Sequence, residues 1–411
     1  MLDLLLECHP NKFLFNFNAS TIITSQSYCM NQRFFSLDVF RGATVALMIL
    51  VNNPGSWSHI FPPLAHASWH GVTPTDLVFP FFLFAVGNAM AFVLPRLEEK
   101  NIFWQKVLKR SLLIFLIGLF LNWFPFIKYN AEGNLVAKPF ETLRIFGVLQ
   151  RIAVSYLFAA IIIHLFKLRG AFVVASFLLL LYWFLCVALN PADPYSLSGW
   201  FGTTIDLKIL GAKHMYAGEG RPFDPEGIMN SIGSIVQVIF GYFVGQYILT
   251  KGKTAEMLNG LFVAGAVLIF TGFMWDMVFP LNKKIWTSSY TIYTTGLALV
   301  VLSVLIYLIE FKKSTGDWSS FFDVFGKNAL FIFALSALLP RALALIRIPN
   351  GFTDEGKPKY LTPFAWFYEH VCKPLFTSDP RIGSFIYALC FIAMMWFFAW
   401  VLHKKKIYIK V

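Results

Sequence analysis

Long apolar runs separated by polar segments dominate the chain from about residue 37 onward. Runs of roughly 20 apolar residues are long enough to cross the hydrocarbon core of a bilayer as a helix. Ten are present, near 37–52, 74–94, 104–124, 143–165, 171–189, 228–249, 257–278, 287–309, 319–341 and 382–403. Backbone groups in lipid must be hydrogen-bonded within their own segment, which favours helices. The pattern predicts an all-α, polytopic membrane protein with about ten transmembrane helices.

The overall composition agrees with this class. Hydrophobic residues make up 57% of the 411 residues, charged residues only 14%, and the mean hydropathy is +0.63. Soluble domains carry about 25% charged residues, so a soluble class is excluded. The five cysteines show no Cys-x-x-Cys spacing, which indicates neither a zinc site nor a disulfide framework.

The first 32 residues differ from the rest and are expected to be an N-terminal extension of a membrane domain over 33–411. They are polar and rich in Ser, Thr and Asn, and Met30 stands shortly before the first apolar run. We expect Met30 to be the true start of the protein. A short signal peptide is the alternative, although Leu4–Leu6 is a very short apolar core and follows an acid.

Positive charge is distributed unevenly among the loops. The formal net charge of +12 would suggest nucleic-acid binding in a soluble protein. Here Lys and Arg concentrate in every second short loop, whereas 53–73 has none. The positive-inside rule therefore predicts both termini in the cytoplasm, 53–73 outside, and no nucleic-acid partner. A bacterial inner membrane fits such a chain. The long outer segments 190–227 and 342–381 are expected to be ordered caps or partner-binding loops.

Two histidines and an acid gather where the second span leaves the membrane. His66 and His70 precede the span, and Asp76 lies at its start. An imidazole that titrates near neutrality is a natural proton acceptor for an amine or hydroxyl. A histidine pair four residues apart also suits zinc, but the third ligand would be a guess and no metal site is predicted. A structural interfacial pair is the remaining alternative.

Charged residues inside spans are costly and need an explanation. Asp38 and Arg41 are three residues apart near the start of the first span and can pair on one helix face. Gln150 and Arg151 lie at the start of the fourth span. A guanidinium there can recognise a phosphate or carboxylate. For Asp38 and Arg41, an anchor at the membrane edge is the alternative.

Three further features carry candidate chemistry or packing. Asn52 and Asn53 end the first span, either as a helix cap or as amide donors to an oxyanion. A polar and aromatic cluster before the eighth span resembles a ligand rim, with an interfacial belt as the alternative. Its candidate substrate-binding residues, with two from the His66 segment, are Trp69, Asp76, Asn282, Lys283, Trp286, Ser289 and Tyr290. The pair Gly241 and Gly245 in the sixth span predicts close helix packing.

At these residues the chain resembles a known family, the heparan-alpha-glucosaminide N-acetyltransferase family of multi-span acyltransferases with its bacterial relatives. The matching stretches are Leu37–Gly42, Val51-Asn52, His66–Trp69, Asp76–Pro80, Gly147–Ile152, Asp224–Ile228, and Asn282-Lys283 through Trp286 to Ser289-Tyr290. They occur in the right order and extend over most of 33–403. The resemblance implies a transmembrane acyltransferase domain over 33–411.

The resemblance also implies the reaction. Family members take acetyl-CoA from the cytosol and acetylate an amino sugar on the other side of the membrane. The family's active histidine falls on His66, and a nearby family asparagine falls on Asn52. His66 would take the proton of the attacking amine, and Asn52 would stabilise the thioester oxyanion. Direct transfer and an acetyl-histidine intermediate both remain open.

In this interpretation acetyl-CoA binds from the cytoplasmic side. Basic ends of the helices would hold its phosphates, and its long arm would reach between the helices toward His66. The candidate cofactor-binding residues are Asp38, Arg41, Gln150 and Arg151. The acceptor would be a small molecule or saccharide, and a homodimer is left open.

A transporter of amino sugars or oligosaccharides is the alternative from a different class. Ten spans and buried charges suit a carrier equally well. A carrier should show inverted repeats and broken helices in matching places, and the sequence shows neither clearly. A purely structural membrane protein would leave Asp38, Arg41 and Arg151 unexplained.

Overall fold

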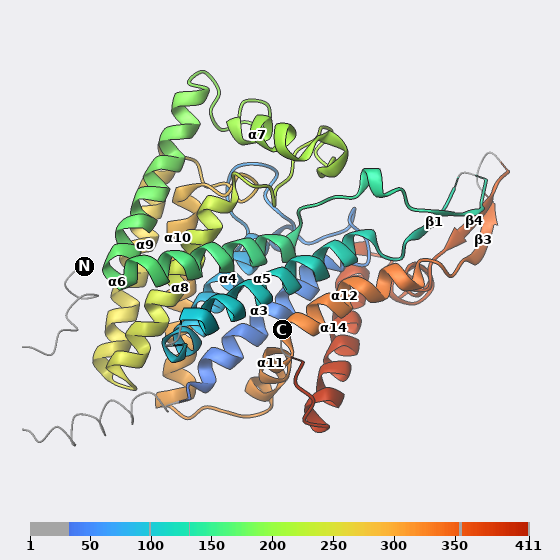
Figure 1. Ribbon diagram of the computed structural model, residues 1–411. Helices are drawn as coiled ribbons and strands as arrows, with labels where there is room; N and C mark the ends of the chain where they lie inside the picture. Colours follow the sequence, from blue (N-terminus) through green and yellow to red (C-terminus); the bar gives the residue numbers. More distant parts are fainter. Residues whose placement is uncertain (1–32, 98–99, 131, 353–355, 410–411) are drawn as a thin grey trace, which may run out of the picture.

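Most of the chain is helical in the computed structural model, which describes residues 33–97, 100–130, 132–352 and 356–409 (Figure 1). The N-terminal extension expected over 1–32 lies outside the described residues. The helices are α3 (Phe35–Asn52), α4 (Pro74–Val93), α5 (Lys100–Trp123), α6 (Val148–Leu189), α7 (Phe201–Leu210), α8 (Ser231–Lys251), α9 (Ala255–Asp276), α10 (Ser288–Ile306), α11 (Asp317–Lys327), α12 (Ala329–Leu343), α13 (Pro363–Phe367) and α14 (Pro380–Lys404). Two antiparallel hairpins join β1 (Ile127–Tyr129) to β2 (Leu135–Ala137) and β3 (Ile348–Phe352) to β4 (Pro358–Leu361).

The predicted class is confirmed. Among the described residues, seven helices are long and apolar enough to cross a membrane. Counting α11 and α12, which meet at 80°, as one bent span raises the number to eight.

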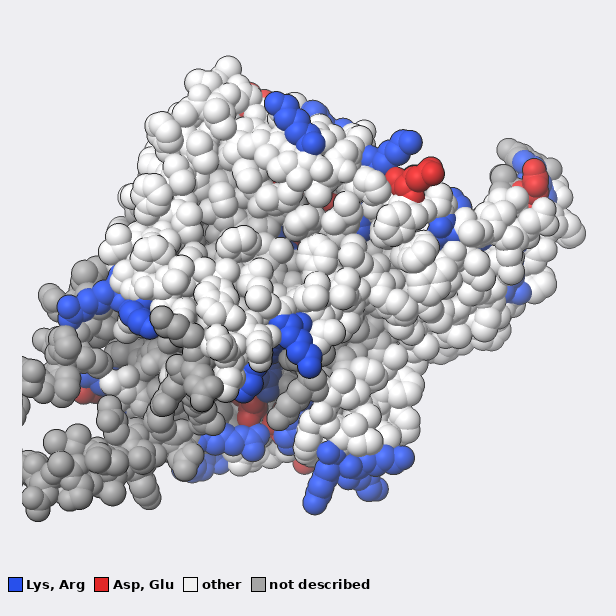
Figure 2. All heavy atoms as spheres, viewed as in Figure 1, with Lys and Arg blue, Asp and Glu red and all other residues white. Residues whose placement is uncertain are grey.

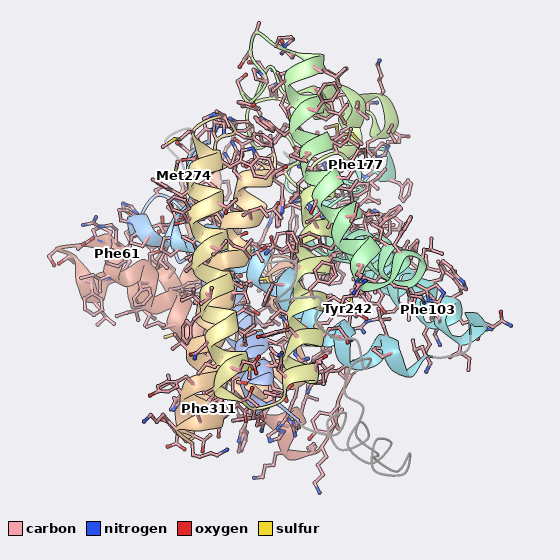
Figure 3. The ribbon with its side chains drawn as sticks, turned by 90° about the vertical axis from the view of Figure 1, so that its left-hand side faces the viewer. Phe61, Phe103, Phe177, Tyr242, Met274 and Phe311 are labelled. Atoms are coloured by element: carbon pink, nitrogen blue, oxygen red, sulfur yellow. The ribbon has the colours of Figure 1, made fainter. Side chains whose placement is uncertain are left out.

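The number of spanning helices differs from the ten expected for identifiable reasons. The predicted spans 143–165 and 171–189 are the two limbs of one 42-residue helix, α6, which breaks at Lys167 with a positive φ of 55°. The run 319–341 is divided between α11 and α12 at Asn328. The third run, in α5, carries Lys and Arg through its first half. Figure 3 shows the second limb of α6, which carries Phe177, standing upright beside α8 and α9.

Both limbs of α6 reach the same end of the molecule. We call this the site end; there the segments 53–73, 124–147, 190–230 and 277–287 meet. Backbone bonds join these segments, from Gly71 N to the Leu281 carbonyl at 2.8 Å and from Ile145 N to the His214 carbonyl at 3.1 Å. The opposite end holds the α8–α9 turn, α11 and the end of α14, and Figure 2 shows Lys and Arg side chains along this lower edge.

The long segments expected to be ordered do contain regular structure. Segment 190–227 contains α7, and 342–381 contains the β3–β4 hairpin and α13. In Figure 1, α7 covers the top of the bundle, and the two hairpins project together to the right. Tyr129 of β1 donates to the Leu345 carbonyl at 3.0 Å, and Arg347 lies over the Tyr129 ring. The two hairpins are therefore packed against each other.

Helices α4 and α8 cross closely, and this crossing confirms the packing role predicted for Gly241 and Gly245. A Cβ at Gly241 would overlap the Phe84 carbonyl, and one at Gly245 would lie 2.6 Å from the Ala91 Cβ. Gly87 of α4 faces the same crossing from the other side. Only glycine lets these two backbones approach so closely. The crossing fixes the position of α8 against α4, the helix that begins next to His66 and His70.

We therefore predict that Gly241→Ala destabilises the protein by about 1–3 kcal/mol, since the added methyl group overpacks the α4–α8 crossing. Thermal unfolding of the purified protein in detergent measures this loss. Gly316→Ala is the matched control, because its Cβ would meet no atom within 4 Å. Equal melting temperatures for the two variants would contradict the close crossing.

Candidate active site

A buried carboxylate organises the site end. Asp76 occupies the third position of α4, and its side chain is only 1% exposed. Its Oδ2 accepts hydrogen bonds from Ala67 N at 3.0 Å, Thr73 N at 3.1 Å and Thr73 Oγ1 at 3.0 Å. The N-terminus of α4 also favours a negative charge at this position. The sequence thus builds a rigid anionic acceptor at the mouth of the helix.

His66 uses the remaining oxygen of Asp76. His66 Nδ1 lies 2.7 Å from Asp76 Oδ1, and the His66 side chain is 40% exposed. With Nδ1 on a buried carboxylate, Nε2 is left to exchange protons with a substrate. Lys283 Nζ lies 3.0 Å from His66 Nδ1 and 3.4 Å from Asp76 Oδ1. Burial lowers the pKa of Lys283, while Asp76 and Glu226 act to raise it.

A second charged group lies beside the first. Arg144 forms salt bridges with Asp224 at 2.6 Å and Glu226 at 2.5 Å. Burial works against the charged Arg144, but the two carboxylates outweigh it and raise the pKa of Arg144. Burial likewise acts to raise the pKa of Glu226, but Arg144 and Arg151 lower it overall. The 124–147 and 190–230 segments are therefore held together by charge.

Arg151 lies deeper, within the first turn of α6, and is almost completely buried. Its guanidinium donates to Asn230 Oδ1 and lies 4.8 Å from the centre of the Trp286 ring. Asn230 Nδ2 donates to the Lys284 carbonyl at 3.0 Å. Arg151 thus connects α6, the start of α8 and the 277–287 loop, beneath the Arg144 salt bridges.

The rim expected around 282–290 is in fact a buried turn. Asn282, Trp286, Ser289 and Tyr290 are all fully buried. Their polar groups bond the protein itself: Tyr290 OH donates to the Asp76 carbonyl at 2.5 Å, and Ser289 Oγ donates to the Phe279 carbonyl at 2.5 Å. Aromatic packing and hydrogen bonds to backbone carbonyls draw the segment inward, so it does not form an open rim in the structure. The role of these residues in substrate binding stays a prediction.

Three other candidates for substrate binding differ in accessibility. Asp76 is enclosed behind His66, so it acts on His66 rather than on a substrate. Trp69 is half-buried and donates from Nε1 to the Tyr195 carbonyl at 2.8 Å. Lys283 keeps 21% of its side chain exposed, and Lys284, which lies over the Trp69 ring, keeps 20%. Trp69 and Lys283 are therefore the members of the predicted set that a substrate can reach.

The four predicted cofactor residues fall into two separate groups. Asp38 and Arg41 pair as expected, with Arg41 NH2 2.9 Å from Asp38 Oδ1, and Arg41 Nε donates to the Gly326 carbonyl of α11. This pair lies at the opposite end of α3 from the His66 loop. Gln150 and Arg151 lie at the site end, because α6 starts there. The sequence could not separate the two groups, since it showed only that each charge was costly.

Asn52 precedes the His66–Asp76 pair in the sequence, and His70 lies between the two members of the pair. Asn52 is the last residue of α3 and is exposed, and within the described residues its side chain makes no hydrogen bond. The neighbouring Asn53 donates to the Ile49 carbonyl at 2.9 Å, as a helix cap would. His70 Nδ1 lies 3.4 Å from Asn282 Nδ2, and burial lowers the pKa of His70. In the described part of the chain, no group of three or more His, Cys, Asp or Glu side chains could hold a metal.

Sequence reasoning missed the Arg144–Asp224–Glu226 group and Asn230 as site residues. The sequence marks Asp224-Pro225-Glu226-Gly227 by family resemblance alone, and Arg144 opens the predicted fourth span, 143–165. The available signal is that two acids, Asp224 and Glu226, lie in a predicted outer loop while Arg144 lies at the start of a distant span. Such opposite charges can pair when the chain folds. Asp206 of α7 supports this loop, because its Oδ1 accepts from Ile228 N at 3.2 Å and Met229 N at 3.4 Å.

The fold and the site define a polytopic membrane protein with a histidine–aspartate pair at one end of its helices. Residues 33–272 match the family described as heparan-alpha-glucosaminide N-acetyltransferase, catalytic, and the chain belongs to this family.

Two relatives carry the same name. The human heparan-alpha-glucosaminide N-acetyltransferase is 28% identical over 359 residues, which cover 73% of this chain and 52% of the relative. The mouse protein is 26% identical over 433 residues, which cover 91% of this chain and 60% of the relative. The chain thus spans little more than half the length of these curated relatives.

Asp206 gives the site a testable pH dependence. Burial raises the pKa of Asp206 to about 7, and the Asp224 charge adds to this, against the two backbone donors. The folded protein then holds a proton that the unfolded chain, with a pKa of 3.8, has already released. Stability therefore falls as the pH rises from about 4 through about 7.

We predict that Asp206→Asn removes this loss, so that the variant melts at a higher temperature than the wild type above pH 7 but not near pH 4. The amide keeps an acceptor for Ile228 and Met229. Melting curves of both proteins across this pH range give the difference. Asp379→Asn is the control and should show no such gain, since Arg381 lowers the pKa of Asp379. A pH-independent difference would contradict the assignment.

Proposed function

We propose that this protein transfers an acetyl group from cytosolic acetyl-CoA to the amino group of an amino sugar on the extracytoplasmic side of the membrane. Membership of the family supports the reaction type. The observation that carries the proposal is the His66–Asp76 pair, a half-exposed imidazole fixed by a buried carboxylate at the point where α4 meets the polar end of the bundle.

The pair suits base catalysis of acyl transfer. The acceptor amine attacks the thioester carbon while His66 Nε2 takes its proton, and Asp76 stabilises the imidazolium that forms. The carbon–sulfur bond then breaks, and the imidazolium returns the proton to the thiolate. The products are the N-acetyl sugar and free CoA, and His66 is again neutral. Asn52, exposed at the end of α3, is available to donate to a substrate oxygen.

The residues present fit the acyl donor at two places. Arg41 keeps 30% of its side chain exposed at the opposite end of α3, among the basic residues there, and it is available to CoA phosphates. At the site end, buried polar side chains of α6, α8 and the 277–287 loop include donors without a protein partner among the described residues. The long arm of CoA would join these two places between the helices.

The acceptor would approach at the site end. Trp69 and Lys284 lie together there, and Lys284 pairs with Glu219 at 2.9 Å. An aromatic face suits the apolar side of a sugar ring, and a carboxylate can accept hydrogen bonds from its amino and hydroxyl groups. The site end then corresponds to the extracytoplasmic side, and the basic opposite end to the cytoplasm of a bacterial inner membrane.

We predict that His66→Ala lowers acetyl transfer by about 100- to 10,000-fold, because the amine loses its proton acceptor, while acetyl-CoA still binds. Transfer of labelled acetyl groups to glucosamine and calorimetric binding of acetyl-CoA measure the two effects. His70→Ala is the control and should retain most of the activity. Near-normal turnover in His66→Ala would refute the assignment, and activity in neither variant nor wild type would favour a transporter.

The predicted sidedness can be tested separately. In a cysteine-free background, Ser58→Cys at the site end should react with a membrane-impermeant maleimide added outside intact cells. Ala255→Cys in the α8–α9 turn should react only after the membrane is opened, because it would face the cytoplasm. Both positions are exposed. Labelling of Ala255→Cys in intact cells would reverse the proposed orientation.

A further inference from the structure

Three helices direct polar side chains to a common line inside the bundle, directly beneath the His66–Asp76 pair. On α8 and the residue before it, these side chains follow a helical stripe of three to four residues. We call the group the polar seam; it consists of Arg151, Ser155, Asn230, Ser234, Gln237, Trp286, Thr291 and Thr294. All eight are buried, and their contacts join the three helices, as between Ser155 Oγ and Ser234 Oγ at 2.7 Å.

The seam contains strong donors that the protein does not use. Within the described residues, Arg151 Nε and Trp286 Nε1 are buried and have no hydrogen-bond partner. Gln237 bonds Thr294 with one amide atom, and its other has no partner. A buried unpaired polar group costs about 1–3 kcal/mol. Two such donors on residues in contact with each other are left for an acceptor from outside the chain, such as a bound ligand.

The backbone of Trp286 is in a strained conformation. Its φ is 52°, in the left-handed region that a bulky residue rarely adopts. The ring packs edge-on against Phe79 at 5.3 Å, and a Cβ at Gly233 would lie 2.5 Å from Trp286 Cδ1. Only glycine at 233 therefore admits the indole. The strained backbone, the tight packing and the unpaired N–H together indicate that the orientation of the Trp286 indole is functional.

The N–H donors of Arg151 and Trp286 lie close to the His66–Asp76 pair, where acetyl transfer would take place. Phe79 lies one helical turn after Asp76 on α4, about 5 Å along the axis. Tyr290 OH bonds the Asp76 carbonyl, and its ring packs on Trp286 at 5.4 Å. Trp286 and Arg151 thus lie one turn below the His66–Asp76 pair, on the membrane side. A thioester arriving between the helices would meet them as it reaches His66.

We propose that the Nε–H of Arg151 and the Nε1–H of Trp286 are oxyanion donors in addition to the Asn52 amide, binding the thioester carbonyl oxygen and stabilising the negative charge it gains during transfer. This rests on the proposed function. When the amine attacks, the carbonyl π electrons move onto this oxygen; when the carbon–sulfur bond breaks, they return to re-form the carbonyl. Both donors are fixed before the charge develops, in a site with little water, where such donors act most strongly.

The inference can be tested by binding alone, with two unreactive acetyl-CoA analogues. One is the methyl ketone in which a methylene group replaces the thioester sulfur; the other is S-ethyl-CoA, which lacks the carbonyl. Calorimetry on the full-length protein in detergent should show the ketone binding roughly 10-fold or more tightly. Trp286→Phe, which keeps the ring beneath Arg151 but removes the N–H, should reduce this preference several-fold.

Kinetics and a matched control sharpen the test. Trp286→Phe should lower kcat by about 100- to 1,000-fold with little change in KM, since the lost donor acts mainly in the transition state. Trp200→Phe is the control, because Trp200 is an equally buried indole whose N–H donates to Tyr182 OH at 3.1 Å. It should keep the ketone preference. Arg151→Lys, which keeps the charge but not the Nε–H, should lose the preference and serves if Trp286→Phe does not fold.

The possible results separate the inference from the proposed function. Binding of neither analogue to the wild type would refute acyl-CoA as the substrate, and with it the proposed function. Equal binding of both analogues, or a full preference retained in Trp286→Phe and Arg151→Lys, would overturn the oxyanion site while leaving acyl-CoA binding intact. Loss of the preference in Trp200→Phe as well would also overturn it.

Discussion

The buried Asp76 carboxylate is the constraint on which the site end depends. A charge removed from water costs several kcal/mol unless donors surround it, and Asp76 draws those donors from two segments far apart in the chain. Ala67 and Thr73 come from the loop before α4, His66 from the same loop, and Lys283 from a segment more than 200 residues later. The loops can therefore adopt only an arrangement that satisfies this one carboxylate. The orientation of His66 is a consequence.

A second network of buried charges lies beside the Asp76 group. Arg144 and Arg151 on one side, and Asp224 and Glu226 on the other, neutralise each other at the edge of the apolar bundle. Asn230 joins them to the 277–287 loop through the Lys284 carbonyl. The two networks meet at Lys283, which both Asp76 and Glu226 influence. Charges that would be costly separately in a membrane protein are thus concentrated in one place, where chemistry can use them.

The glycine crossing of α4 and α8 connects this polar end to the apolar bundle. Because Gly87, Gly241 and Gly245 let the backbones touch, α8 is fixed against the helix that carries Asp76. The stripe from Asn230 to Gln237 then faces α6 and α10 at a set depth. The polar seam beneath His66 is therefore a result of helix packing, and the paired Asp38 and Arg41 lie too far along α3 to share in it.

The sequence by itself determined the class, the helical segments and the local pairings, but not how many separate spans the segments form. Apolar runs in a chain with so few charges must become internally bonded helices, and residues three apart, such as Asp38 and Arg41, must share a face. Gly241 and Gly245 of α8 predicted a close helix crossing, which the structure shows with α4. The tertiary structure decided the rest. It folded α6 back at Lys167, brought Arg144 to Asp224 and Glu226, and buried Trp286 and Tyr290 where a rim was expected. The physical reason is that the burial of a side chain and the identity of its bonding partners depend on segments far apart in the chain. Hydrophobic periodicity reports only on residues that are close in sequence.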